Sequence, residues 1–309
     1  MNFRFSGHET FPFRYTWLPK AILHLNKNSS LFSDEDEAIA CLGVGKNMVR
    51  AMRFWVEATG IVEPKSGGGL RPSGMGELFF NEDEGLDPFL EDIQTLWVLH
   101  WNISTQINAP LFAWEFLLNH WHDPEISERV ILGAFQREAQ KLSRPLSAVT
   151  LKQHFDIFLH TYVPTQGKKG EILEDNLDCP LTELELITVV GERETEERKR
   201  ELIYAFRREE KPDIKPEIFC WALNDFRMKR HPNEKTLSMR TIATGLGSPG
   251  QIFKIPEEDV RIRLGEIGSV TKGALRYQES TALPQVHFDR PINGNALLRS
   301  ALKQRIIHA

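Results

Sequence analysis

The sequence predicts a mainly α-helical protein with three domains: an N-terminal winged helix-turn-helix at 1–86, a helical connector at 87–165 and a C-terminal α+β domain at 171–309. Apolar residues recur at helical spacing through most of the chain, and three consecutive glycines at 67–69 separate two short strand-like runs. The flexible basic stretch at 166–170 marks the boundary between the second and third domains. A chain of 309 residues has room for two or three domains of ordinary size.

Two helices are expected in the first part of the N-terminal domain. The first begins near Trp17, and Pro19 is tolerated in its first turn because the backbone needs no donor there. Ser33 supplies a capping hydroxyl for the second helix, and the acids at 34–36 suit the positive end of its dipole. Gly43 is able to end this helix because glycine readily adopts the left-handed conformation.

A third helix is expected after the short turn at 43–45. Apolar residues recur at helical spacing over 48–56 and form a core face, whereas basic residues lie largely elsewhere on the same helix. Residues 61–63 and 70–72 are strand-like on either side of the glycine tip, and a short helix follows at 76–80. This order of helices, turn and hairpin predicts the winged helix-turn-helix.

The third helix of such a domain enters the major groove of DNA, and the wing reaches the adjacent backbone. The expected double-stranded DNA contacts therefore lie on this helix and beside the glycine tip: Lys46, Asn47, Arg50, Arg53, Lys65 and Arg71. An alternative is a winged-helix scaffold that binds protein and whose surface charges are merely solvated.

The middle of the chain is expected to be a structural connector. Its apolar residues recur at helical spacing in four segments, 93–101, 111–121, 127–142 and 151–162. The tryptophans of these segments are interpreted as core or interface residues because burial of their large surfaces is their usual stabilising role. The histidines of the middle show no metal-binding spacing and are interpreted as ordinary polar residues.

An acidic block follows the basic linker. Glu174, Asp175 and Asp178 could hold a divalent metal, Mg²⁺ or Mn²⁺, through carboxylate oxygens. Helix capping or turn formation by the same acids is the competing interpretation.

The C-terminal half resembles a second winged helix. Helices are expected at 218–227 and 256–267, and a hairpin at 274–277 with 286–288. Basic residues outnumber acids in this region, so it could follow a phosphate backbone or simply present solvated helix surfaces. These basic residues are Arg227, Lys229, Arg230, Arg240, Lys254, Arg261, Arg263, Lys272 and Arg276.

Composition excludes several classes of protein. The net charge of -5 argues against a protein that coats nucleic acid by bulk attraction, and no apolar stretch is long enough to span a membrane. The three cysteines show neither zinc-site nor disulfide spacing. The first ten residues lack the features of a secretory signal, so we expect a cytoplasmic location.

Three blocks of sequence resemble a known family. They are FSGHETFPFR at 5–14 followed by WLPK at 17–20, DPFLED at 87–92 leading into TLWVLHW at 95–101, and EDNLDCPL at 174–181. These blocks look like those of the domain-of-unknown-function 4007 family, and the resemblance spans most of the chain.

That family is similar to the SspB component of bacterial DNA phosphorothioation systems, which replace a non-bridging phosphate oxygen with sulfur and are linked to phage defence. The resemblance implies a protein that nicks DNA or prepares it for sulfur insertion. The implied partners are a cysteine desulfurase, an adenylating protein of the phosphoadenosine-phosphosulfate reductase type and an ATPase. The resemblance supplies no active-site residues.

A nickase needs an activated nucleophile and stabilisation of the developing phosphate charge, often by a metal. His8 could serve as general base, Glu9 as metal ligand or orienting group, and Arg14 as a phosphate contact. Alternatively, hydrogen bonds pin this N-terminal segment beneath the winged helix. Three hypotheses stay open: a metal-dependent nickase, a non-catalytic DNA-binding subunit or regulator, and a structural adaptor; the sequence also leaves homodimer formation open.

Overall fold

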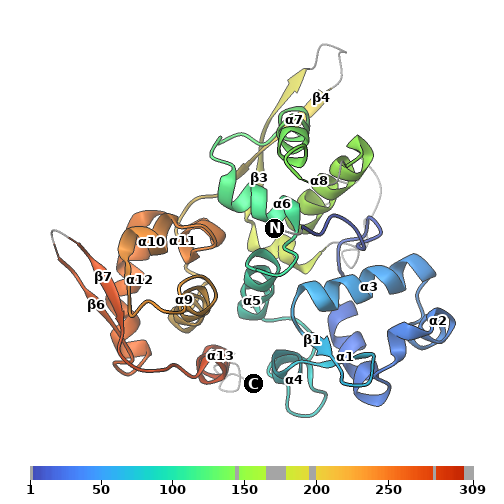
Figure 1. Ribbon diagram of the computed structural model, residues 1–309, viewed down its shortest axis with the longest axis horizontal. Coiled ribbons are helices and arrows are strands. Elements are labelled where there is room, and N and C mark those ends of the chain that lie inside the picture. Colours follow the sequence, from blue (N-terminus) through green and yellow to red (C-terminus); the bar gives the residue numbers. More distant parts are fainter. Residues whose placement is uncertain (1–2, 143–145, 165–178, 195–199, 281–282, 303–309) are drawn as a thin grey trace.

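The computed structural model describes residues 3–142, 146–164, 179–194, 200–280 and 283–302. Within these residues the chain is mainly helical, with three small antiparallel sheets. Figure 1 shows the N-terminal unit and the C-terminal unit on opposite sides of the molecule, with helix α5 (Ile93–Ser104) between them.

Four α-helices, a 3-10 turn and a hairpin make up the N-terminal unit. Helix α3 packs against both α1 and α2, and the hairpin strand β2 packs against α1. The elements in order are α1 (Trp17–Lys27), the 3-10 turn η1 (Leu31–Ser33), α2 (Glu35–Leu42), α3 (Lys46–Ala58), β1 (Val62–Pro64), β2 (Leu70–Pro72) and α4 (Gly74–Phe80).

Helix α2 begins one residue later than the sequence suggested. Asp34, not Ser33, caps it, because the Asp34 side chain accepts hydrogen bonds from the backbone N–H groups of Asp36 and Glu37. Ser33 is instead the last residue of η1. At the other end, Gly43 adopts the expected left-handed conformation with a φ of 61°.

The glycine tip between β1 and β2 is held against a neighbouring loop. Gly67, Gly68 and Gly69 all have positive φ values, which favour glycine. The backbone N–H of Leu70 donates to the carbonyl of Ser29 at 2.9 Å, and a Cβ built on Gly69 would overlap that same carbonyl. The hairpin therefore packs closely against the backbone of Ser29 and is hydrogen-bonded to it.

The middle of the chain forms a helical body with a long hairpin. Helix α5 is buried along most of its length. The expected helix at 111–121 is shorter: it begins as α-helix and continues as a single π-helical turn, η2 (Phe116–His120). The remaining elements are α6 (Phe112–Glu115), α7 (Glu128–Ala139), α8 (Ala148–Tyr162), the 3-10 turn η4 (Pro180–Leu184), β3 (Ile187–Glu194) and β4 (Arg200–Phe206).

The C-terminal unit combines helices with a three-stranded sheet. The strand order in the sheet is β5-β7-β6, and all neighbours are antiparallel. Helix α13 packs against α9, and α12 packs against α9, α10 and β6. The elements are α9 (Pro216–Arg230), β5 (Thr236–Ser238), α10 (Met239–Thr244), α11 (Pro249–Ile252), α12 (Glu257–Val270), β6 (Leu275–Gln278), β7 (Gln285–Phe288) and α13 (Gly294–Leu302).

Tryptophans of α5 join the middle body to the C-terminal half. The indole N–H of Trp97 donates to Asp213 and that of Trp101 donates to Asp225, both at 2.7 Å. Both rings are fully buried, as the sequence interpretation of the aromatic residues expected. No described helix combines the length and apolar character that crossing a bilayer requires.

Candidate nucleic-acid interface

The solvent side of α3 carries a row of polar and basic side chains. Lys46, Asn47, Arg50 and Arg53 are all exposed, whereas Val49 and other residues of the opposite side are buried. The row follows from the helical period, because residues three or four positions apart lie on one face. We call Lys46, Asn47, Arg50 and Arg53 the α3 row.

Carboxylates partner every cation of the α3 row. Lys46 Nζ lies 2.8 Å from one oxygen of Glu35, and Arg50 Nε lies 2.6 Å from the other. Arg53 pairs with Glu57 at 3.2 Å. The hydrogen bond from Arg50, followed by that from Lys46, lowers the pKa of Glu35. Exposed ion pairs such as these contribute little to stability, so the cations can exchange partners.

The two cations of the hairpin are exposed beside the glycine tip. Lys65 Nζ donates to Ser29 Oγ at 3.0 Å, and Arg71 pairs with Glu63 across the two strands. Both side chains extend from a hairpin that directly follows α3 in the chain.

His8 lies in the interior of the protein. It is 4% exposed, and its ring stacks on His154 of α8 and meets the edge of Phe54 of α3. Its Nδ1 accepts a hydrogen bond from the backbone N–H of Thr10 at 3.2 Å. Burial lowers the pKa of His8 to about 4, so the ring is neutral at neutral pH.

Glu9 and Arg14 have different surroundings from His8. Glu9 adopts a left-handed backbone with a φ of 48°. Its charge raises the pKa of Arg50, although less than the hydrogen bond that Arg50 donates to Glu35 does. The Arg14 guanidinium covers the ring of Trp17 at 5.7 Å. Glu9 and Arg14 are both partly exposed, whereas His8 is buried, and a reaction site formed by the three stays a prediction.

The predicted metal ligands Glu174, Asp175 and Asp178 lie outside the described residues. Within the residues that the structure describes, no group of three or more His, Cys, Asp or Glu side chains is arranged to hold a metal ion.

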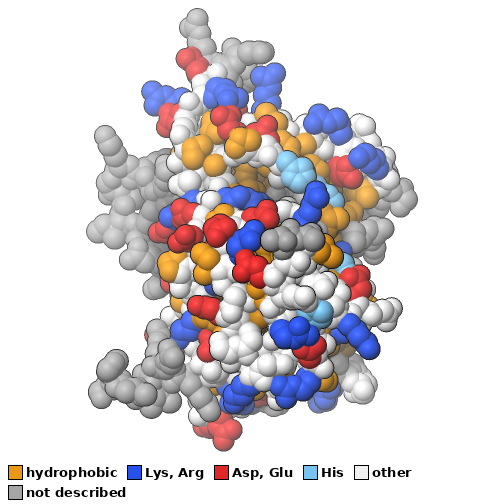
Figure 2. All heavy atoms as spheres, turned by 90° about the vertical axis from the view of Figure 1, so that its left-hand side faces the viewer, with side chains coloured by type: hydrophobic (Ala, Val, Ile, Leu, Met, Phe, Trp, Pro, Cys, Tyr) orange, Lys and Arg blue, Asp and Glu red, His pale blue; other side chains and the backbone are white. Residues whose placement is uncertain are grey.

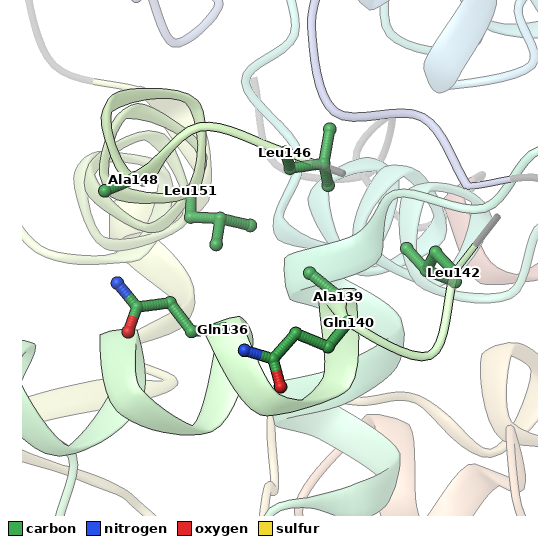
Figure 3. A pocket seen from close by; sticks show the side chains of 7 residues that line it. All are labelled: Gln136, Ala139, Gln140, Leu142, Leu146, Ala148 and Leu151. Carbon is green, nitrogen blue, oxygen red and sulfur yellow. The ribbon is translucent and has the colours of Figure 1, made fainter. Parts of the chain in front are cut away.

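A pocket of about 490 Å³ opens between α7 and α8. Figure 3 shows apolar side chains from both helices and the connection between them, with two glutamine amides at one edge. Among the described residues, the side chains that line this pocket carry no ionisable group. The lining residues are Gln136, Ala139, Gln140, Leu142, Leu146, Ala148 and Leu151.

Internal contacts occupy much of the basic run in the C-terminal unit. Arg263 pairs with Asp259 and donates to the backbone carbonyls of Ile214 and Lys211. Arg276 pairs with Asp289 at 3.2 Å. Figure 2 shows basic, acidic and apolar side chains interspersed over the C-terminal side of the molecule, without a continuous basic surface.

Lys254 is a buried cation, although the sequence analysis grouped it with the other basic residues of the C-terminal half. It is 2% exposed, and its ammonium donates to the carbonyl of Leu118 in η2 at 2.7 Å and lies over the Phe206 ring. Burial, followed by the charge of Arg208, lowers its pKa to about 7. The position of Lys254 inside the apolar run Ile252 to Ile255 could have indicated this burial from the sequence.

The sequence pattern of the family described as "Protein of unknown function (DUF4007)" matches residues 5–304. The chain belongs to this family. Its fold is similar to that of a magnesium ion-bound SspB crystal structure, with a TM-score of 0.80, 25% identity, and coverage of 97% of this chain and 89% of that chain. A second SspB crystal structure matches with a TM-score of 0.79 and 24% identity over the same shares of the two chains. No curated protein matches the sequence.

Proposed function

We propose that this protein is a DNA-binding component of a bacterial DNA phosphorothioation system. The observation that carries the proposal is the α3 row, in which three exposed cations and an amide follow one face of a helix next to a cation-bearing hairpin. Family membership and the similarity to SspB supply the biological context.

In this proposal residues 17–80 act as a winged helix-turn-helix. Helix α3 follows α2 after a turn of three residues, 43–45, and leads into the β1–β2 hairpin. A helix in this position enters the major groove, and the wing lies along the adjacent backbone. Lys46, Arg50 and Arg53 would contact phosphates, together with Lys65 and Arg71 of the wing.

Asn47 has a different role in the same proposal. It occupies the first turn of α3, and its side chain carries both a donor and an acceptor. Such an amide is able to pair with the major-groove edge of adenine, so Asn47 would contribute to the choice of sequence.

The C-terminal unit is proposed as a second winged helix that is not the main DNA contact. Its order of helix, strand, two helices, long helix and hairpin supports the comparison, as does the β5-β7-β6 sheet. The long helix α12 begins with Glu257, Glu258 and Asp259, and these acids oppose an approach to phosphate.

The proposed partners follow from the phosphorothioation context: double-stranded DNA, a cysteine desulfurase, a protein of the phosphoadenosine-phosphosulfate reductase type and an ATPase. The proposed location is the cytoplasm, where bacterial chromosomal DNA is found. The proposed biological role is phage defence. Homodimer formation on DNA is part of the same proposal.

Metal-dependent nicking of DNA is a second candidate function. The observation that favours it is the magnesium ion bound to a similar SspB structure. The described residues hold no cluster of three or more His, Cys, Asp or Glu side chains for that ion, so Glu174, Asp175 and Asp178 stay the proposed ligands and no reaction step is derived. The burial of His8 favours a structural position for this residue over that of a general base in contact with DNA. A supercoiled plasmid that becomes an open circle only when Mg²⁺ or Mn²⁺ is added would support nicking.

DNA binding by the α3 row is tested by the affinity for a short duplex, measured against salt concentration. Each phosphate contact that is lost lowers the slope of log affinity against log salt by about one unit. We expect Arg50→Ala to weaken binding and lower the slope. Arg276→Ala is the matched control, because Arg276 is also an exposed arginine paired with one carboxylate, but it lies on the C-terminal unit. Equal behaviour of the two variants would contradict the proposal.

A further inference from the structure

The two oxygens of the Glu35 carboxylate bind two different cations of the α3 row. Oε2 lies 2.8 Å from Lys46 Nζ, and Oε1 accepts a hydrogen bond from Arg50 Nε at 2.6 Å. Glu35 is the first residue of α2, and the Asp34 cap fixes the backbone of that turn. The position of the carboxylate therefore follows from the packing of α2 against α3.

A DNA phosphate would make the same contacts as this carboxylate. A backbone phosphate also carries one negative charge and offers two oxygens to neighbouring cations. Glu35 holds Lys46 Nζ and Arg50 Nε, so a phosphate that approaches these cations must either displace the carboxylate or share the cations with it. In both cases the negative charge of Glu35 beside the phosphate weakens binding of DNA along the α3 row.

We propose that Glu35 is a built-in competitor for DNA phosphate, which sets the affinity of the α3 row for the duplex. The proposal rests on the proposed DNA-binding function and deepens it. Phosphates occur at every position of DNA, so the competitor lowers the affinity for all sequences. It thereby reduces the fraction of the protein held on unrelated DNA by charge alone.

Neighbouring acids provide a matched control for this effect. Asp36 lies one position further along α2 and is exposed, and in the described part of the chain it forms no ion pair with Lys46 or Arg50. Asp36→Asn and Glu35→Gln each remove one negative charge from the same helical turn. A difference between the two variants therefore reports the local competition and not the net charge.

The experiment measures the affinity of a fluorescently labelled short duplex of mixed sequence for the full chain, by anisotropy at several salt concentrations. We expect Glu35→Gln to bind about fivefold more tightly at low salt, and the gain to shrink as salt rises. Asp36→Asn should gain less than about twofold. In a background carrying Lys46→Ala and Arg50→Ala, Glu35→Gln should have no further effect, because its partners are gone.

Three outcomes would overturn the inference. If Lys46→Ala with Arg50→Ala leaves duplex affinity unchanged, the proposed function of the α3 row fails and the competitor with it. If that double variant weakens binding but Glu35→Gln binds like the parent, only the competitor fails. If Glu35→Gln and Asp36→Asn gain equally, net charge is the cause. Thermal unfolding of each variant confirms that the fold is retained, which the exposure of these side chains favours.

Discussion

The imidazole rings of His8 and His154 stack in the interior of the protein, with their centroids 5.6 Å apart and their planes at 19°. They come from positions 146 residues apart in the chain. His154 Nε2 accepts a hydrogen bond from the backbone N–H of Ala113, so the pair links the N-terminal segment to α6 and α8. This contact attaches the segment that precedes the N-terminal unit to the middle body.

The histidine pair predicts a pH dependence of stability. Burial holds the pKa of His8 at about 4 and that of His154 at about 3, below the ordinary value of 6.5. Because the unfolded chain then binds more protons, stability is fully present above pH 6.5 and is lost as pH falls towards 4. We expect urea unfolding at a series of pH values to show this loss, at up to about 3 kcal/mol for one histidine.

Replacement of His8 distinguishes the contribution of the histidine pair to the pH dependence of stability from the contributions of other titrating groups. We expect His8→Ala to lower the free energy of unfolding at pH 7 by about 1–3 kcal/mol and to flatten the pH dependence below 6.5. His122→Ala, at an exposed position, should leave both unchanged. A His8→Ala variant as stable as the parent at pH 7 would show that the pair does not hold the segment.

The glycine tip predicts a difference between two neighbouring substitutions. Gly67 and Gly69 both have positive φ, but only a Cβ on Gly69 meets the Ser29 carbonyl, whereas nothing lies within 4 Å of one on Gly67. We expect Gly67→Ala to cost about 1 kcal/mol and Gly69→Ala clearly more, as measured by thermal unfolding. Equal costs would contradict the close approach of the hairpin to Ser29.

Asn47 predicts a change of sequence preference. We expect Asn47→Ala to alter which duplexes are selected from a random pool, while the salt dependence of affinity stays close to that of the parent. Arg50→Ala should show the opposite pattern, because phosphate contacts carry no sequence information. If Asn47→Ala selects the same duplexes as the parent, this amide does not read bases.

Local signals were sufficient to predict the N-terminal elements. The helical period placed α3 correctly, since Val49, Met52 and Trp55 are buried and the α3 row is exposed. The capping residue was missed by one position because Ser33 and Asp34 are both good caps and only the structure shows which side chain reaches the backbone.

The features that could not be predicted from the sequence depend on contacts between residues far apart in the chain. The β3–β4 hairpin was not predicted: β3 ends in a charged, exposed run, and the pair joins the middle body through Ile126 and Tyr204. Pairing of Glu35 with Lys46 and Arg50 depends on how α2 and α3 pack, which neither segment encodes alone. The packing of His8 against His154 was not predicted, because the two residues lie far apart in the chain.

The most direct test of the account is cross-linking of the protein to DNA from a defined position on α3. A photoreactive amino acid in place of Asn47, on the exposed side of α3, is compared with the same group in place of Arg276 on the C-terminal unit. DNA binding through the α3 row predicts that irradiation with a duplex yields a cross-linked complex from position 47 and little from position 276. Efficient cross-linking from position 276 and none from position 47 would contradict it and assign DNA binding to the C-terminal unit.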